Sequence, residues 1–252
     1  MSAFRITALC ILFSLTAAVT GYSQDTLLCG VRTVFSAEKK MFPSRWTHKK
    51  VGARATFLAG TAIPRVTAVV FRALSRYPDG FPDRYLDRIY VLQSLQFYGY
   101  PYGGSFTKKT IYLAFDETNP LNTDRYLEER FHHEFSSILW IENRKLLDLE
   151  KWSSFNPEGF VYGEGGLDAI RNGTASMETD PGYFPIGFIN RYAMTEIEQD
   201  INVAAQNLFC GGPEFWRIVD ENERIRGKVM LLIGFYQALD PVFTESYFRT
   251  ID

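Results

Sequence analysis

The segment from Thr123 to Leu147 constrains the fold more than any other, because it is long, contains no glycine or proline and carries a helical hydrophobic pattern. Apolar side chains recur at spacings of three and four residues, which places them on one helix face: Leu127, Phe131, Phe135 and Ile138. Trp140 adds apolar surface on another side, so the pattern predicts a helix that is buried most of the way round. The same helix would hold His132, His133 and Glu134, and ionisable groups are costly to bury without partners.

His133 and Glu134 match the first two positions of the zincin pattern H-E-x-x-H. In that pattern two histidines at i and i+4 share a helix face and bind zinc, and the glutamate acts as general base toward the zinc-bound water. The fifth position here is Ser137, whose hydroxyl is a poor zinc ligand beside imidazole. His132 does not replace it, because it lies about 100° round the helix from His133. A hydrogen-bonded His and Glu in the core is therefore the alternative interpretation.

A later segment adds context, since Gly187 to Ile201 reads G-F-I-N-R-Y-A-M-T-E-I-E-Q-D-I. With residues 131–139 it resembles a family of exported bacterial zinc-binding metallopeptidases, whose relatives include substrate-import-associated zinc metallohydrolase lipoproteins. Active-looking members read F-H-H-E-F-x-H-I-L at the helix and G-F-[VI]-x-x-Y-A-x-S-x-x-x-E-D-F later. The resemblance covers roughly Tyr77 to Arg249. It implies a zincin-like α+β fold, in which a small sheet is followed by a central motif helix and a helical C-terminal half.

The resemblance also assigns roles to residues of this chain. His133 matches the first zinc ligand and Glu134 the general base, whereas Ser137 stands at the second ligand position. The third ligand, a glutamate in the family, falls on Gln199, and Glu198 would serve only if the register slipped by one residue. A hydrolytic zinc site needs about three protein ligands and a water. We therefore expect zinc to bind weakly or not at all.

Three hypotheses remain open from the sequence. The first is a degenerate member of the family that works as a binding or scaffold protein. The second is an active metallohydrolase with a remodelled site that uses His133, a carboxylate from Glu198 or Asp200, and Glu129. The third is a likeness of fold only, in which the histidine and glutamate are polar groups of the core.

The first residues have the composition of an export signal. Arg5 is the only charged residue before Asp25, and Ile6 to Val19 is apolar but short for a membrane span. We predict cleavage between Gly21 and Asp25, which leaves residues 25–252 as one zincin-like domain. No lipoprotein cleavage box precedes Cys29, so we expect a secreted or periplasmic protein without a membrane anchor.

Charge and cysteine content limit the partners of the mature chain. Arg5 is the only one of the 27 Lys and Arg residues before residue 25, so 26 basic side chains face 29 acidic ones. We expect no basic patch and find no nucleic-acid motif, which argues against a nucleic-acid partner. Cys29 and Cys210 are the cysteines that remain, and an oxidising compartment favours a disulfide between them, with two free thiols as the alternative.

Thr110 to Ala114 reads as the strand before the motif helix. In zincins the strand at this place commonly forms the sheet edge, and an extended polypeptide pairs with such an edge through its backbone. We therefore expect a peptide or protein segment along this strand, with an ordinary interior strand as the alternative. Periodicity predicts further strands at 31–35 and 88–97, helices at 63–77, 197–209, 214–220, 224–239 and 241–249, and an irregular region at 151–180.

Overall fold

Strand β4 (Arg88–Phe97) lies at the centre of a mixed sheet in the computed structural model, which describes residues 25–36, 38, 40–163, 165–173 and 176–251. The predicted export signal and its cleavage position lie outside the described residues. The main path of the sheet runs β1 (Thr26–Leu28), β2 (Val31–Val34), β4, β7 (Thr110–Ala114) and β6 (Gly104–Thr107). β2, β4 and β7 are parallel, and the outer strands β1 and β6 are antiparallel to their neighbours. β3 (Arg54–Phe57) and β5 (Tyr100–Pro101) also pair with β4.

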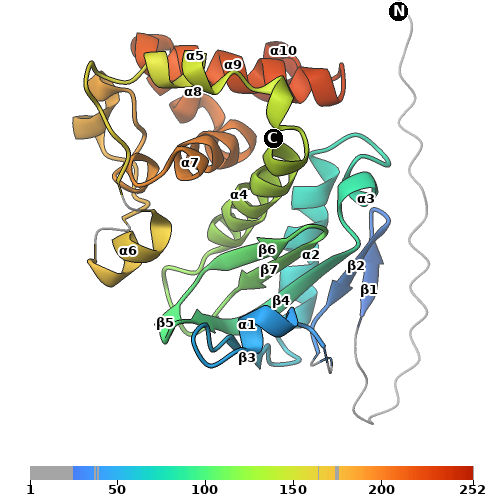
Figure 1. Cartoon of the computed structure of the whole chain (residues 1–252). Coiled ribbons are helices and arrows are strands. Elements are labelled where there is room, and N and C mark those ends of the chain that lie inside the picture. The colour runs from blue at the N-terminus through green and yellow to red at the C-terminus, as the bar shows by residue number, and fades with distance from the viewer. Residues whose placement is uncertain (1–24, 37, 39, 164, 174–175, 252) are drawn as a thin grey trace, which may run out of the picture.

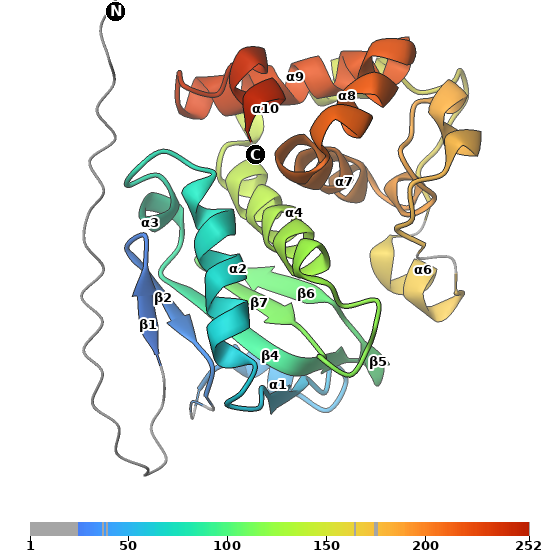
Figure 2. The same cartoon turned by 180° about the vertical axis from the view of Figure 1, so that it is seen from behind.

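Helices α2 (Ile63–Ser75) and α4 (Asp124–Glu142) cover one face of this sheet (Figures 1 and 2). α2 starts with proline near its first position and buries the apolar stripe that the sequence predicted: Val66, Val69, Val70 and Leu74. The opposite face carries an aromatic cluster that includes Tyr90, Tyr112, Phe97 and Trp46. The sheet is therefore buried on both faces, as expected where its central strands are parallel.

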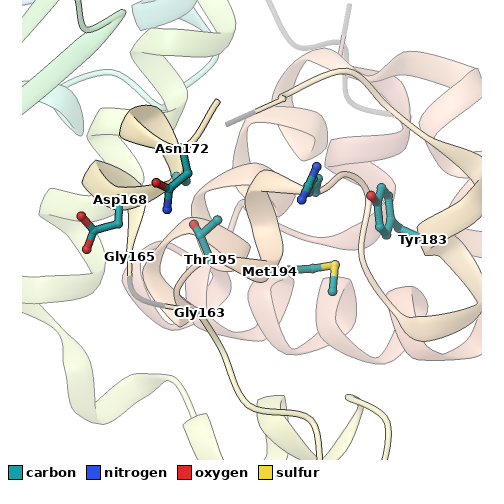
Figure 3. A pocket seen from close by; sticks show the side chains of 9 residues that line it. Gly163, Gly165, Asp168, Asn172, Tyr183, Met194 and Thr195 are labelled. Carbon is teal, nitrogen blue, oxygen red and sulfur yellow. The ribbon is translucent and has the colours of Figure 1, made fainter. Parts of the chain in front are cut away.

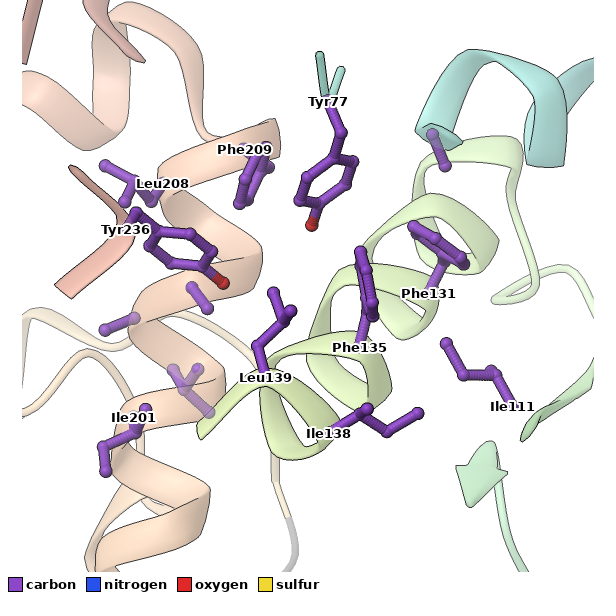
Figure 4. Close-up of a cluster of buried hydrophobic side chains, with 14 of the residues drawn as sticks. Tyr77, Ile111, Phe131, Phe135, Ile138, Leu139, Ile201, Leu208, Phe209 and Tyr236 are labelled. Atoms are coloured by element: carbon purple, nitrogen blue, oxygen red, sulfur yellow. The ribbon is translucent and has the colours of Figure 1, made fainter. Parts of the chain in front are cut away.

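The motif helix α4 starts at its cap residue Thr123, whose side chain accepts a hydrogen bond from the backbone N–H of Tyr126. Its buried side chains fall on more than one side, as the sequence predicted. Figure 4 shows Phe131 and Ile138 close to Ile111 of β7, whereas Leu139 lies on the side of helix α7 (Ile197–Cys210). Burial of each such large apolar side chain stabilises the fold by about 1.5–3 kcal/mol. α4 is thus fixed between the sheet and the C-terminal helices.

The remaining helices complete a helical second half (Figure 1). The predicted ones are α7, α8 (Gly212–Glu221), α9 (Glu223–Leu239) and α10 (Glu245–Thr250). The sequence did not predict α1 (Ser44–Thr47), α3 (Pro82–Tyr85), α5 (Leu149–Ser154), α6 (Gly166–Arg171) and the short 3₁₀ helices Arg144–Leu146, Pro181–Ile186 and Tyr192–Met194. The expected α+β architecture, a small sheet followed by a motif helix and a helical C-terminal half, is confirmed. None of the described helices is long and apolar enough to cross a membrane.

Two expectations are corrected by the topology. β7 pairs with β4 on one side and β6 on the other, so Thr110–Ala114 is an interior strand and the free edge belongs to β6. The predicted disulfide is not formed, because Cys29 and Cys210 are both free. Cys29 lies in the exposed turn between β1 and β2 near Ser75, whereas Cys210 ends α7 beside Glu128 of α4.

Candidate functional site

Helices α4 and α7 pack against each other, and the predicted site residues meet at their contact. His133 and Ser137 are four residues apart on α4, so they share the face that is turned to α7. His133 Nε2 lies 3.0 Å from Oε1 of Gln199, and Ser137 donates a hydrogen bond of 2.7 Å to Oε1 of Glu198. The position that corresponds to the family's third ligand, Gln199, is therefore opposite the position of its first, as the predicted register requires.

The imidazole of His133 is held by two side-chain amides. Its Nδ1 lies 2.9 Å from Oε1 of Gln206, and that oxygen also accepts a hydrogen bond of 2.7 Å from Arg130. Burial and the neighbouring Arg130 cation lower the pKa of His133 to about 3, so the ring is neutral and carries one N–H. Oε1 of Gln206 accepts from Nδ1, so the lone pair of the neutral ring lies at Nε2. The oxygen and nitrogen of a side-chain amide exchange places when the amide is flipped, and the flipped Gln199 amide donates its N–H to Nε2. An amide thus covers the nitrogen lone pair that a metal would need.

Ser137, at the second ligand position, belongs to a second hydrogen-bonded group. Its hydroxyl donates to Glu198 and accepts from Nδ2 of Asn202 at 2.7 Å. Burial raises the pKa of the Glu198 carboxyl, which favours its neutral form. These bonds satisfy the Ser137 hydroxyl without a cation, whereas the buried Oδ1 of Asn202 has no hydrogen-bond partner in the described structure.

Glu134, the expected general base, lies on the neighbouring side of α4 under the edge strand β6. A Cβ atom added to Gly104 of that strand would come within 2.6 Å of Glu134 Oε1, so only glycine leaves room there. Burial, against the opposing effect of Arg130 and with a smaller contribution from Glu198, raises the pKa of Glu134 to about 8. Glu134 is therefore mostly protonated at neutral pH and does not act as a base in this state.

Asp200 and Glu129, which the remodelled-site hypothesis used, do not reach His133. One oxygen of Asp200 accepts hydrogen bonds from Trp152 (2.9 Å), Tyr162 (2.8 Å) and Lys228 (2.7 Å), so it joins α7 to α5 and α9. Glu129 pairs with Arg125 one turn earlier on the same helix, at 2.8 Å. Both carboxylates are held by other side chains in the described structure, so neither is placed as a partner of His133.

The sequence interpretation missed three residues of the site: Arg130, Asn202 and Gln206. The signal for two of them was present, because Gln199, Asn202 and Gln206 follow one another at spacings of three and four, which places them on one face of the predicted helix. Such a polar stripe inside a buried helix requires a polar face opposite it. Arg130 lies one turn before His133 and Glu134 on α4, where it approaches both.

The donor set does not fit a zinc ion. The side chains that face one another are one imidazole, three amides, a hydroxyl and the Glu198 carboxyl, which lies one residue away from the family's register. Zinc prefers thiolate, imidazole and carboxylate ligands, usually three or four together. In the described structure, the one imidazole nitrogen that could bind is already paired. We therefore derive no chemical step through a metal.

A second group of metal-ligand types lies on the far side of α4. Glu128, His132 and Cys210 offer ligand atoms within 4.8 Å of one another. Glu128, however, forms ion pairs with Arg72 at 2.7 Å and with Arg76, and burial holds the pKa of the Cys210 thiol well above its ordinary value. Two guanidinium groups beside a protonated thiol disfavour a further cation, so this group also makes a poor metal site.

An open pocket of about 430 Å³ flanks the α4–α7 site (Figure 3). Asp168 of α6 and Asn172, which follows this helix, line it on one side, and Thr195 and Met194 line it on another. The adjacent Tyr192 has its ring centroid 6.2 Å from that of His133.

Comparisons with known proteins agree with this fold. No family model and no curated protein matches the sequence. Among solved structures, the chain is similar to a crystal structure described as a "putative zinc-binding metallo-peptidase" from Bacteroides caccae, with 14% sequence identity, 85% of each chain covered and a TM-score of 0.52. At this identity the likeness concerns the α+β fold alone. The site described above differs from a complete zinc site in its donor set.

Proposed function

We propose that this chain is a non-hydrolytic relative of the zincin-like metallopeptidases, which binds an extended polypeptide segment instead of cutting it. The observation that carries the proposal is the pairing of His133 with Gln199 and Gln206. The amides occupy both ring nitrogens, so the arrangement is stable without zinc. Retention of the fold together with loss of the ligands supports a binding role.

Strand β6 supports the choice of an extended polypeptide as the ligand. It is the outer strand beside β7, all four of its residues are partly exposed, and Gly104 lies directly against Glu134. In an antiparallel pair, opposed residues alternate between hydrogen-bonded and non-hydrogen-bonded positions. The two-residue loop Lys108–Lys109 sets this alternation, so the backbone N–H and C=O groups of Gly104 and Phe106 point away from β7. An added strand gains these hydrogen bonds with little sequence demand. The polypeptide that was expected along Thr110–Ala114 would therefore pair with β6 instead.

One observation favours a second candidate, an active hydrolase with a remodelled site. The Glu198 carboxyl faces the α4–α7 contact and would supply a ligand next to His133 if Ser137 released it. Such an enzyme would hold its metal with one imidazole and carboxylate or amide oxygens, a set that shifts preference away from zinc. Cleavage of a polypeptide substrate distinguishes it from the binding protein.

We also propose that the protein acts outside the cytoplasm, secreted or periplasmic. Support comes from the sequence before Asp25, with one basic residue followed by a short apolar run. Intact mass of the exported protein tests this. A chain that starts between Tyr22 and Asp25 is expected, and a retained Met1 or a lipid on Cys29 would contradict it.

The binding role is tested with reduced, carboxymethylated lactalbumin as an unfolded polypeptide probe. We expect saturable binding by fluorescence anisotropy and no new fragments by mass spectrometry. Amide hydrogen exchange should slow at Gly104 and Phe106, while β1, the edge strand at the other end of the sheet, serves as the internal control. Fragments would support the hydrolase, and binding without protection at β6 would refute the proposed surface.

A further inference from the structure

Four basic side chains from separate parts of the chain line one hollow of about 400 Å³ in the protein surface. Lys49 and Lys50 follow α1, Arg54 begins β3, and Arg171 ends α6. Val51, Gly52, Gln96, Tyr98 and Gly99 complete the lining of this basic pocket. Sequence alone did not reveal this hollow, because Arg171 is far from Lys49, Lys50 and Arg54 along the chain. The expectation that the protein has no basic patch is therefore wrong at this place.

The positive charge of the basic pocket is largely uncompensated. Arg171 has a carboxylate partner, Asp168, at 3.1 Å. For Lys49, Lys50 and Arg54, the described structure shows no carboxylate within ion-pair distance. Three unpaired cations around one concave surface repel one another and attract anions into it.

Backbone strain next to these cations is a second, independent observation. Tyr98 and Gly99 form the two-residue loop between β4 and β5, with φ angles of 56° and 81°. A loop with two positive φ angles suits Asn-Gly or Gly-Gly, whereas a bulky residue at the first position is strained. The Tyr98 N–H donates to the carbonyl of Val51 at 2.6 Å, which holds the loop against the 49–52 segment.

The strained tyrosine gains little from burial. Its side chain is on the surface, with Tyr98 42% exposed, and its ring lies 5.9 Å from the guanidinium carbon of Arg171 at the wall of the pocket. An unfavourable backbone conformation that presents an exposed aromatic ring to a set of cations indicates a role in binding rather than in folding. Tyr98 is also one of the residues that line the basic pocket.

We propose that the basic pocket binds a multivalent oxyanion, a phosphate- or sulfate-bearing group of a larger ligand. A single carboxylate would neutralise one of the three unpaired cations, whereas a doubly or triply charged group matches them. Arg54 and Arg171 offer planar donor pairs to such oxygens and the lysines add point charges. The site shares no residue with the α4–α7 contact or with β6, so it stands or falls independently of the proposed polypeptide binding.

Calorimetric titration of the purified protein with two probes tests the proposal, inorganic pyrophosphate for a phosphate source and sucrose octasulfate for a sulfated carbohydrate. At least one should bind with Kd below about 1 mM at low ionic strength and several-fold more weakly at about 0.15 M salt. The double variant Lys50→Gln/Arg54→Gln should lose at least tenfold in affinity. The matched control Lys40→Gln/Lys145→Gln removes two exposed cations elsewhere and should bind as the wild type does.

Tyr98→Asn separates a role of Tyr98 in binding from a general effect of charge, because the substitution leaves the charge of the basic pocket unchanged. Asparagine tolerates the left-handed conformation, so the melting temperature should rise, by about 2–4 °C, while affinity for the bound probe falls several-fold. The probe that binds identifies the source of the oxyanion. Failure of both probes, equal loss in the two double variants, or unchanged affinity in Tyr98→Asn would overturn the proposal.

Discussion

Replacement of Glu134 by glutamine should make the protein more stable, and increasingly so as the pH rises. The buried carboxyl has a folded-state pKa of about 8 against an ordinary value of 4.5. Because the folded pKa is the higher one, the full stability is present below about pH 4.5 and is lost as the pH rises through 8. At about 1.4 kcal/mol per pKa unit, the whole shift corresponds to about 4–5 kcal/mol. Glutamine keeps the shape of the neutral carboxyl and does not ionise.

Urea unfolding at several pH values between 4 and 9 measures this effect. Wild type and Glu134→Gln should have similar free energies of unfolding near pH 4, differ by about 3 kcal/mol at pH 7 and by about 4–5 kcal/mol at pH 9. Glu198 also has a raised pKa and is present in both proteins, and its interaction with Glu134 is already part of the Glu134 shift used above. Glu142→Gln, at the exposed end of α4, is the matched control and should run parallel to wild type. Parallel curves for Glu134→Gln would refute the buried, neutral state of this carboxyl.

Two further substitutions test the surroundings of the site. Lys228→Met removes the cation that pairs with the buried Asp200 at 2.7 Å, so the free energy of unfolding in urea should fall by about 3–5 kcal/mol. The double variant Lys228→Met/Asp200→Asn should recover part of this loss, and an equal loss in the single and double variants would contradict the pairing. Gly104→Ala brings a methyl group within 2.6 Å of Glu134 and should lower the free energy of unfolding by about 1–3 kcal/mol, and Glu134→Ala in the same chain should relieve this loss. An unchanged stability of Gly104→Ala would show that β6 does not lie tightly against Glu134.

The helical half of the fold follows from the sequence because its signals are local. α4, α7 and α9 are long helices with clear three- and four-residue periodicity, and their predicted positions agree with the structure within a few residues. β4 and β7 are confirmed for the same reason, since both are runs of β-branched and aromatic residues. β3, β5 and β6 were missed because they are short and their pairing with β4 or β7 depends on distant segments.

The candidate site was predicted in part, and the reasons for the misses are physical. Helical geometry put His133 and Ser137 on one face, and the family's register put Gln199 opposite them, which the structure bears out. Sequence could not show that Glu198 points to Ser137 while Asp200 points away to Lys228, since adjacent helical positions differ by about 100° and the rotation of α7 is set by packing. Which strand forms the free edge depends on the order of strands in the sheet, and no local sequence pattern indicates that order.

The central claim is that the α4–α7 site is stable without zinc, and calorimetric titration with zinc tests it most directly. Wild type should show no one-to-one binding tighter than about micromolar. Ser137→His/Gln199→Glu, which restores both ligand positions, should bind zinc with Kd below about 1 µM, since three ligands suffice for such a site. Addition of His133→Ala to that variant should abolish the gain. Tight one-to-one binding by wild type that His133→Ala removes would contradict the account and make the remodelled hydrolase the better explanation.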